Sequence, residues 1–350
     1  MTENLHVISS KATILDALSS LNALSGGVMT LLVTDDNGKL QGTLTDGDIR
    51  RALLRGESVN EHVTAAMNRN FCALQGDDID VAQVREYRRK GITLLPHLNS
   101  DGTIRCIHNL KKTNTILPLD AILMAGGKGE RLRPLTLTTP KPLLEISGKP
   151  IIDYNIEALA AVGIKNVTVA TRYLAEKIYA HFEKPVAGIS VKCITEDKPM
   201  GTIGAASLVN LKKDGNTLVM NSDLLTSVSF EDMYIKHISE NADITVAAIP
   251  YTVSVPFAIL TTEGSSITGL EEKPIYSYYA NAGIYIISNN LLRQLPKNSP
   301  TDATTLIEDA IRDNYKVVYY PITGTWIDIG TPADFAHAQE LMQHLKNLSL

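Results

Sequence analysis

The chain has 350 residues, which at roughly 150 residues per domain indicates two domains. Hydrophobic residues make up 44% and charged residues 20%, a composition that excludes a largely disordered or fibrous chain. The formal net charge of -5 argues against a nucleic-acid-binding protein, and no apolar run reaches the ~20 residues that span a bilayer. Cys72, Cys106 and Cys193 form no CxxC pair. Unpaired cysteines of this kind favour a reducing compartment, and no secretory signal is visible in the sequence. The expected location is therefore the cytoplasm.

An internal repeat occupies the first third of the chain. Residues 38–48, GKLQGTLTDGD, align with residues 102–112, GTIRCIHNLKK, at an offset of 64 residues. A helical pattern and an apolar stretch precede each segment, so each copy is expected to read helix, strand, turn, strand, helix. The expected helices are 12–24 and 78–91. Neither copy is large enough for a good core, so the two (about 1–58 and 59–117) are predicted to pack as one domain.

The repeat resembles a tandem pair of CBS domains, an α+β module, over residues 1–117. In that family, the second threonine and the second aspartate of a motif such as GTLTDGD contact the ribose of an adenine nucleotide. The resemblance therefore implies a ligand at Thr45 and Asp48. The second copy has Lys112 where the first has Asp48, which argues against a second site of this type. Alternatively, the aspartates only cap the helix that follows.

From residue 119 onwards, short apolar runs alternate with amphipathic helical stretches. This alternation predicts an α/β fold with a mostly parallel, Rossmann-like sheet and helices on both faces. Ligands of such sheets lie at the carboxyl ends of the strands. The expected helices are 153–163, 174–182, 231–239, 304–313 and 332–346. The expected strands are 120–125, 166–171, 189–194, 216–221, 243–249, 257–262 and 281–287.

A glycine-rich loop follows the first of these strands. Gly126, Gly127 and Gly129 have no Cβ, so the backbone can approach a phosphate and direct N–H groups towards it. Arg131 adds a guanidinium for phosphate oxygens. The loop lacks the spacing of a P-loop or a dinucleotide fingerprint, and such a loop alone is more often a turn. Lys141 stands between two prolines, which predicts an extended, stiff segment.

Six blocks in order resemble the nucleotidyltransferases that make nucleotide sugars from sugar 1-phosphates. They are GGKGERLRPLT (126–136) with TPKPLLEISGKPII (139–152), PMGTIGA (199–205), NSD (221–223), EEKP (271–274), NAG (281–283) and WIDIGT (326–331). The resemblance covers about residues 119–350. It implies an enzyme in which a sugar phosphate oxygen attacks the α-phosphorus of a nucleoside triphosphate, and pyrophosphate leaves.

The same resemblance implies roles for individual residues. Lys141 contacts the nucleotide phosphates, Arg131 contacts the departing pyrophosphate, and Asp223 and Asp328 hold Mg²⁺. The other implied contacts are with the nucleotide, by Met124, Gly126, Gly127, Gly129, Gly201 and Thr202, and with the sugar phosphate, by Glu272, Lys273 and Asn281. Taken alone, each aspartate is more often a cap or turn residue, and the EEK segment is alternatively a solvated charged turn.

Family members that carry CBS domains before the transferase domain resemble guanylyltransferases that make GDP-glucosamine-type sugars. These sugars are precursors of bacterial nonulosonic acids such as legionaminic acid. GTP and a glucosamine-type 1-phosphate are therefore the expected substrates. Mannose 1-phosphate or a manno-heptose 1-phosphate is the alternative within the class. An alternative of another class is a non-catalytic protein that senses adenine nucleotides through the CBS pair. A homo-oligomer is also expected. The eight histidines show no spacing along the chain that is typical of metal ligands.

Overall fold

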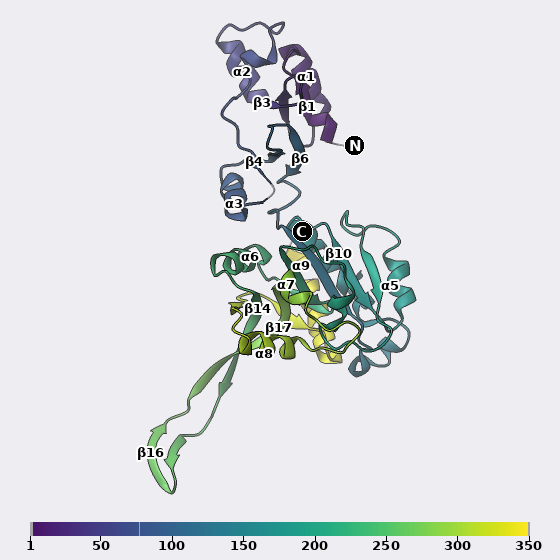
Figure 1. The fold of residues 1–350 in the computed structure, drawn as a ribbon, viewed down its shortest axis with the longest axis vertical. Helices are drawn as coiled ribbons and strands as arrows, with labels where there is room; N and C mark the ends of the chain where they lie inside the picture. Colours follow the sequence, from purple (N-terminus) through teal and green to yellow (C-terminus); the bar gives the residue numbers. More distant parts are fainter. Residues whose placement is uncertain (1–2, 77, 349–350) are drawn as a thin grey trace. The chain divides into compact units, whose positions relative to one another are not determined.

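The computed structural model describes residues 3–76 and 78–348 (Figure 1). The chain divides into two compact units. Unit 1 spans Met1–Pro118 with Ala161–Gly163, and unit 2 spans Leu119–Ala160 with Ile164–Leu350. Among the described residues, no helix combines the length and the apolar character that a membrane crossing requires.

Unit 1 contains two copies of one strand arrangement. In the first copy, β1 (Val7–Ser9) runs parallel to β2 (Thr30–Thr34), which pairs antiparallel with β3 (Leu40–Thr45). In the second copy, β4 (Leu74–Gln75), β5 (Leu94–Leu98) and β6 (Ile104–Asn109) repeat this pattern. The helices are α1 (Ile14–Ala23), α2 (Asp46–Leu54) and α3 (Val81–Arg89), with 3-10 turns at Glu3–His6 and Val63–Ala65.

The two copies differ after their last strand. In the first copy α2 follows β3 directly, whereas residues 110–118 after β6 form turns and extended chain. The expected final helix of the second copy is therefore wrong. The physical reason is local composition, because this segment combines Thr113, Asn114, Thr115 and Pro118, which all have low helix propensity.

The core of unit 1 has three parts. In the first copy, α1 and α2 cover one face of the sheet and bury Ile14, Leu31, Val33, Leu44 and Ile49 completely or nearly so. The other face packs against the second copy through Leu32, Leu40, Leu94 and Leu98. A third cluster lies between α3 and β4–β6. Each copy thus completes its burial only with the other.

Within the described residues, unit 2 is built on a sheet in the order β11-β10-β7-β12-β17-β14-β18. β17 runs antiparallel to both neighbours, and the other pairs are parallel, so the predicted mostly parallel α/β sheet is confirmed. The strands are β7 (Leu119–Ala125), β10 (Val167–Thr171), β11 (Lys192–Thr195), β12 (Asn216–Asn221), β14 (Ile244–Ser254), β17 (Ile275–Ser288) and β18 (Val317–Pro321).

Helices cover both faces of this sheet. They are α4 (Ile151–Ala161), α5 (Ala175–His181), α6 (Phe230–Ser239), α7 (Asn289–Leu292), α8 (Ala303–Arg312) and α9 (Pro332–Leu348), and all except α7 match expected helices. α7 and α8 pack on the face that contains Ile122 of β7. Its neighbours Ala121 and Leu123 point to the opposite face and are also buried, as expected for a strand covered on both sides.

β14 and β17 are longer than the sequence predicts. Their paired ends leave the sheet as a two-stranded ribbon, which continues into the hairpin of β15 (Ile259–Glu263) and β16 (Ser266–Glu271) (Figure 1). We call residues 250–279 the arm. The expected strand at 257–262 therefore does not join the central sheet. Most arm side chains are exposed, although Tyr279 at the base of the arm packs against Tyr319 of β18, with ring centroids 4.7 Å apart.

Several short elements complete unit 2. They are the strand pairs β8 (Glu145–Ile146) with β9 (Lys149–Pro150) and β13 (Leu224–Thr226) with β19 (Trp326–Asp328), and the 3-10 turns at Glu130–Leu132, Leu135–Leu137, Lys141–Leu143 and Gly204–Leu208. The β13–β19 ribbon packs with Ile151 of α4 and Ala338 of α9 in one buried cluster.

Candidate active site

The residues that follow four parallel strands meet at the carboxyl edge of the central sheet. Gly126 follows β7, Arg172 follows β10 and Glu196 follows β11, while Asp223 lies two residues beyond β12. These strands are neighbours, so their following residues meet. They line a cavity of about 320 Å³. Of the residues predicted for the site, Met124, Gly126, Gly127, Gly201, Thr202 and Asp223 contribute to its wall.

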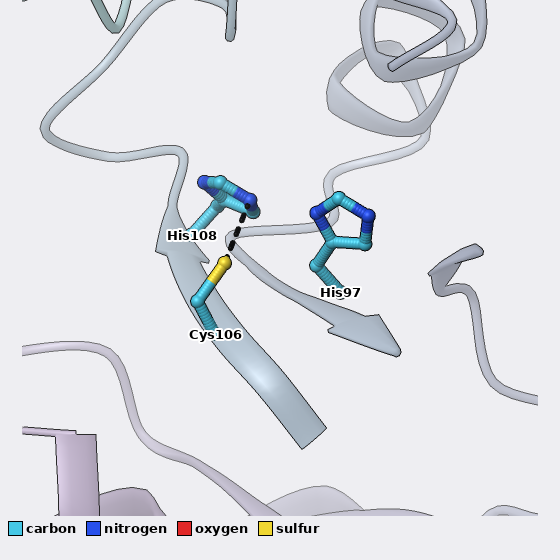
Figure 2. Close-up of side chains that lie close together, drawn as sticks. All are labelled: His97, Cys106 and His108. Carbon is cyan, nitrogen blue, oxygen red and sulfur yellow. Dashed lines mark hydrogen bonds between the residues drawn. The ribbon is translucent and has the colours of Figure 1, made fainter. Parts of the chain in front are cut away.

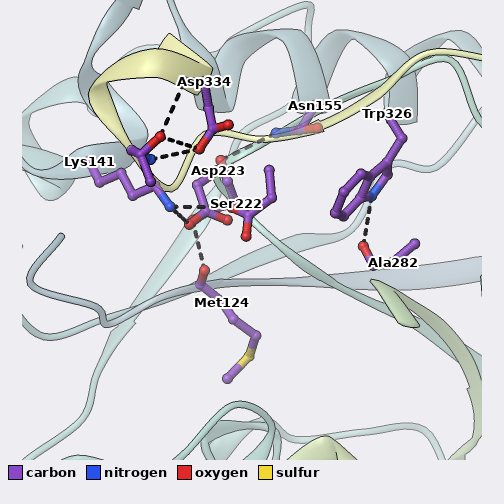
Figure 3. A network of polar contacts seen from close by, with 10 residues as sticks. Met124, Lys141, Asn155, Ser222, Asp223, Ala282, Trp326 and Asp334 are labelled. Carbon is purple, nitrogen blue, oxygen red and sulfur yellow. Dashed lines mark hydrogen bonds and ion pairs between the residues drawn. The ribbon is translucent and has the colours of Figure 1, made fainter. Parts of the chain in front are cut away.

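Lys141 lies between two carboxylates beside this cavity. Its Nζ forms an ion pair with Asp223 Oδ2 (Figure 3). The same nitrogen lies 3.5 Å from Asp328 Oδ1. The lysine side chain is 12% exposed, so its charge is held in a defined place. The structure thus brings together the lysine and both aspartates that the family resemblance implied.

A two-stranded ribbon brings Asp328 to Asp223. β13 begins directly after Asp223, and Leu224 pairs with Asp328 on β19. The N–H of Ile329 also donates to the carbonyl of Asp223 at 3.2 Å. Because the pairing fixes the register, the two carboxylates are positioned by backbone hydrogen bonds rather than by a flexible loop.

Contacts on both sides hold this ribbon in place (Figure 3). At one end, Trp326 Nε1 donates to the carbonyl of Ala282 at 2.9 Å. At the other end, Asp334 accepts from the N–H and hydroxyl of Thr331 at 2.8 and 2.7 Å, and so caps the start of α9. On the β12 side, the Ser222 hydroxyl donates to the carbonyl of Met124 at 2.7 Å.

Lys141 lies against the glycine loop. Lys141 begins a 3-10 turn, so the expectation of an extended segment is wrong at this residue. Pro140 is extended, and Pro142 fits the first turn because its missing N–H has no partner there. Gly129 has a φ of +61°, and a Cβ on it would lie 2.9 Å from Thr136 Cγ2 and 3.2 Å from Lys141 Cβ. A side chain at this position would therefore displace the lysine.

Burial sets the electrostatics of the carboxylates. It raises the pKa of Asp223, and Lys141 opposes the rise. Burial also raises the pKa of Glu196. The N–H of Met200 at 3.3 Å and the guanidinium of Arg172 at 3.9 Å oppose this rise. A Cβ on Gly126 would lie 2.6 Å from Glu196 Oε1, so the glycine allows this carboxylate to approach the loop.

Arg172, Glu196 and Asn221 also line the cavity, although they are not among the predicted site residues. A signal for them exists. Arg172 and Glu196 are the first residues after a parallel strand, and Asn221 is the last residue of one. The rule that ligands bind at the carboxyl ends of such strands points to all three.

Three other predicted residues have clear structural partners. Arg131 is exposed and lies beside Gly330, where a Cβ would be 3.1 Å from its guanidinium. Gly201 has a φ of +74° and closely approaches the chain before α8. The hydroxyl of Thr202 accepts from the N–H of Ala303 at 2.8 Å and so caps that helix.

The predicted sugar-phosphate contacts are divided in space. Asn281 lies on β17, and its Oδ1 accepts from the N–H of Gly283 at 2.9 Å. Glu272 and Lys273 are exposed residues of the arm. β17 begins at Ile275, just after these two residues. At a strand rise of ~3.4 Å per residue, Ile275 is already about 20 Å from Asn281. The structure therefore does not bring Glu272 and Lys273 to the Lys141 cluster.

In unit 1, Thr45 and Asp48 form the N-terminal cap of α2. The Thr45 N–H donates to Asp48 Oδ2 at 2.9 Å, and the Asp48 N–H donates to the Thr45 hydroxyl at 3.3 Å. The other oxygen of Asp48 pairs with Arg51 at 2.6 Å. Both side chains thus cap the helix, which is the alternative expected for Asp48.

The oxygen atoms of Asp223 and Asp328 fit a hard divalent cation. Both carboxylates converge on the same point, which Lys141 Nζ contacts. Among the described residues, the buried Oδ1 of Asp223 has no hydrogen-bond partner, which leaves a free ligand atom. Carboxylate oxygens are the ligands that Mg²⁺ prefers, and a bound cation would supply positive charge for phosphate oxygens.

Several known proteins resemble this chain. The catalytic subunit beta of a mannose-1-phosphate guanylyltransferase from Danio rerio is 32% identical over 226 residues, and a mannose-1-phosphate guanyltransferase beta-A from Xenopus laevis is 33% identical over 227 residues. Each match covers 62% of this chain and 62% of the relative. HddC from Yersinia pseudotuberculosis is 22% identical with a TM-score of 0.50, over 64% of this chain and 99% of that chain, which shows a shared fold.

Two family models match separate parts of the chain. The CBS domain model matches residues 1–55, in the first copy of unit 1. The Nucleotidyl transferase model matches residues 120–344, which include the glycine loop, Lys141 and both aspartates. Because this match covers more than half of the sequence, the chain belongs to the nucleotidyl transferase family and carries a CBS domain before its transferase domain.

Proposed function

We propose that this protein transfers a nucleotidyl group from a nucleoside triphosphate to a sugar 1-phosphate. The supporting observation is the cluster of Lys141, Asp223 and Asp328 beside the glycine loop at the carboxyl edge of the sheet. In the proposed reaction, a sugar phosphate oxygen bonds to the α-phosphorus, the bond to the β-phosphate oxygen breaks, and pyrophosphate leaves with its electron pair. The attacking phosphate is largely ionised near neutral pH, so the site needs no general base.

The residues of the site have complementary tasks in this proposal. Lys141 neutralises nucleotide phosphate oxygens, and the N–H groups of the Gly126–Gly129 loop and the guanidinium of Arg131 bind the departing pyrophosphate. Asp223 and Asp328 hold a divalent metal, which we propose is Mg²⁺. Lys141 stands between these carboxylates, so it also limits their mutual repulsion before the substrates bind.

We propose GTP and a glucosamine-type 1-phosphate as substrates, with mannose 1-phosphate or a manno-heptose 1-phosphate as the second candidate. The names of the two relatives support GTP as the nucleotide and favour mannose 1-phosphate as the sugar phosphate. A pyrophosphate-release screen of four nucleoside triphosphates against these sugar phosphates tests the proposal. We expect the highest kcat/KM with GTP. Preference for dTTP or UTP would contradict the guanylyltransferase assignment. Failure of every pair would instead favour a non-catalytic nucleotide sensor.

For unit 1 we propose one adenine nucleotide, bound through Thr45 and Asp48. The cap of α2 supports this placement because it presents a hydroxyl and a carboxylate at one helix end, although the ligand must share them with the cap. Calorimetry of the full chain with ATP, ADP and AMP tests it. One site per chain that is lost in Asp48→Asn supports the proposal, because asparagine preserves the cap. Two equivalent sites, or binding unaffected by this change, would contradict it.

A homo-oligomer is the proposed assembly, and the arm supports it. An isolated two-stranded ribbon is marginally stable in water, and this one exposes large apolar side chains. They include Tyr251, Phe257, Ile267, Leu270 and Tyr278, which are 57–73% exposed. A second copy that packs against the arm would cover them. Light scattering should therefore give a mass at least twice that of one chain.

A further inference from the structure

The two copies in unit 1 differ in chemistry on one face of their sheets. In the first copy this face lies under α1 and α2, where Val33 and Leu44 are completely buried and Gly42 lies against Met67. The second copy has no helix equivalent to α2 in this place, since residues 110–118 form turns and extended chain. At the repeat offset of 64 residues, Val33, Gly42 and Leu44 correspond to His97, Cys106 and His108.

The strand register brings these three residues together. His97 on β5 pairs directly with Cys106 on β6, and His108 is two residues further along β6, so all three side chains share one face. Cys106 Sγ lies 3.4 Å from His108 Nε2, and the two imidazole centroids are 5.8 Å apart (Figure 2). One ligand atom from each residue lies within 4.8 Å of the other two.

A backbone carbonyl fixes the orientation of His97. Its Nε2 lies 2.7 Å from the carbonyl oxygen of Gly76, which only accepts hydrogen bonds, so Nε2 carries the proton. The lone pair of the neutral ring is then on Nδ1. Figure 2 shows one nitrogen of this ring turned towards Cys106 and His108. A second-layer carbonyl that orients a histidine in this way is typical of metal sites, and this histidine is 4% exposed.

We propose that His97, Cys106 and His108 bind one divalent transition-metal ion of the zinc class. One thiolate and two imidazoles are a borderline-soft ligand set, which suits Zn²⁺ and disfavours Mg²⁺ and Ca²⁺. The 3.4 Å between sulfur and nitrogen is close to the ~3.5 Å edge of a tetrahedron with metal–ligand bonds of ~2.3 and ~2.0 Å. A shift of His97 completes the geometry. On binding, the metal–sulfur bond forms and the Cys106 thiol releases its proton to solvent.

Cys106 and His108 are partly exposed, which gives an ion a path to the site. Three protein ligands leave a fourth position for water or another donor. The metal would link β5 to β6 on the face where the first copy has apolar packing and a helix. Its binding would therefore stabilise the second copy, because an ion that binds the folded chain raises the free energy of unfolding.

Titration of the untagged, metal-stripped full chain with Co²⁺ tests this site. We expect one ion per chain with a thiolate-to-cobalt charge-transfer band and the d–d bands of tetrahedral Co²⁺, both removed by Zn²⁺ and unaffected by Mg²⁺. Cys106→Ser should abolish the charge-transfer band. Cys72→Ser and Cys193→Ser are matched controls that should retain it, because these cysteines lie outside the cluster. Cobalt at Asp223 and Asp328 would give no thiolate band.

A second measurement keeps the test decisive if one variant folds poorly. Zn²⁺ should raise the melting temperature of the wild-type chain, and this shift should be lost in His108→Ala as well as in Cys106→Ser. Circular dichroism verifies the fold of each variant. The proposal is overturned if the wild-type chain gives no thiolate band, or if the band persists in folded Cys106→Ser. Neither measurement depends on the transferase reaction, so the proposed function is tested separately.

Discussion

The charge of Lys141 is shared by two carboxylates and, in the proposed reaction, by the phosphates of the substrate. Lys141→Ala should lower both turnover and nucleotide affinity. A charge-assisted hydrogen bond contributes roughly 1.5–3 kcal/mol, which corresponds to about 10- to 150-fold in kcat/KM. Steady-state kinetics measures this loss. Lys165→Ala is the matched control, because Lys165 is exposed and precedes β10 at the opposite end of the strand. A change in melting temperature alone would make Lys141 a structural residue.

Asp223 is the carboxylate with the free buried oxygen, and its substitution tests the metal assignment. Asp223→Asn keeps the shape of the side chain and removes its charge, so we expect the fold to remain and turnover to fall at least roughly a hundredfold, or about 2.7 kcal/mol. Kinetics at saturating Mg²⁺ measures the effect. Asp214→Asn makes the same change at an exposed position and should be neutral. Near-normal turnover of a folded Asp223→Asn protein would contradict the assignment.

Single residues of the site were predictable only in part. Lys141, Asp223 and Asp328 are far apart in the chain, and no local pattern links them, so the resemblance of sequence blocks was needed to connect them. Their contact depends on the pairing of Leu224 with Asp328, which no periodicity reveals. Arg172 follows β10 directly and could have been found from the strand pattern alone.

At the level of elements, α6 and β14 are joined by a buried histidine that makes the stability of unit 2 depend on pH. His237 Nδ1 lies 2.8 Å from the Thr245 hydroxyl, and the side chain is 1% exposed. Burial lowers the pKa of His237 to about 4, although Asp243 opposes this shift. The unfolded chain, with a histidine pKa near ~6.5, therefore binds more protons than the folded chain between these two values.

The free energy of unfolding should accordingly decrease as the pH falls from about 6.5 to about 4. The contribution of His237 is at most about 3 kcal/mol, at 1.36 kcal/mol per pKa unit. Urea unfolding at several pH values measures the slope. His237→Gln should flatten it, because glutamine does not titrate, whereas His344→Gln at an exposed position should leave it unchanged. Equal slopes for wild type and His237→Gln would contradict the prediction.

Elements with a strong helical period were predictable, and strands were predictable only where other elements cover them. The positions of α4, α6 and α9 follow from their apolar spacing. The apolar run of β15 has the pattern of a buried strand, yet it belongs to the exposed arm. Likewise, the spacing of the histidines along the chain gave no sign of a cluster, because His97 and Cys106 meet across two strands.

For the molecule as a whole, the arm is the part of unit 2 that packs least against the rest of the chain. Replacing residues 255–274 with Asn-Gly joins Ser254 to Ile275, which already pair across the ribbon. All of the removed residues lie within the described range, and none belongs to the buried hydrophobic core. The central sheet should therefore fold normally, with an unchanged circular dichroism spectrum. We expect light scattering to show weaker association, because the ribbon loses the exposed apolar side chains of Phe257, Leu260, Ile267 and Leu270.

The same deletion also removes Glu272 and Lys273, so point variants must separate assembly from substrate binding. Glu272→Gln and Lys273→Ala leave the apolar side chains of the arm in place and should preserve the assembly state. If these residues bind the sugar phosphate, the variants should raise the KM for the sugar 1-phosphate and leave the KM for the nucleotide unchanged. Since the arm carries both residues away from Lys141 within one chain, such a result would require the arm to bend back or to reach the site of another copy. Mixing Lys273→Ala with Asp223→Asn separates these two routes. Activity in the mixture above the sum of the two separate variants requires an arm that serves another copy, whereas activity equal to that sum indicates an arm that serves its own chain.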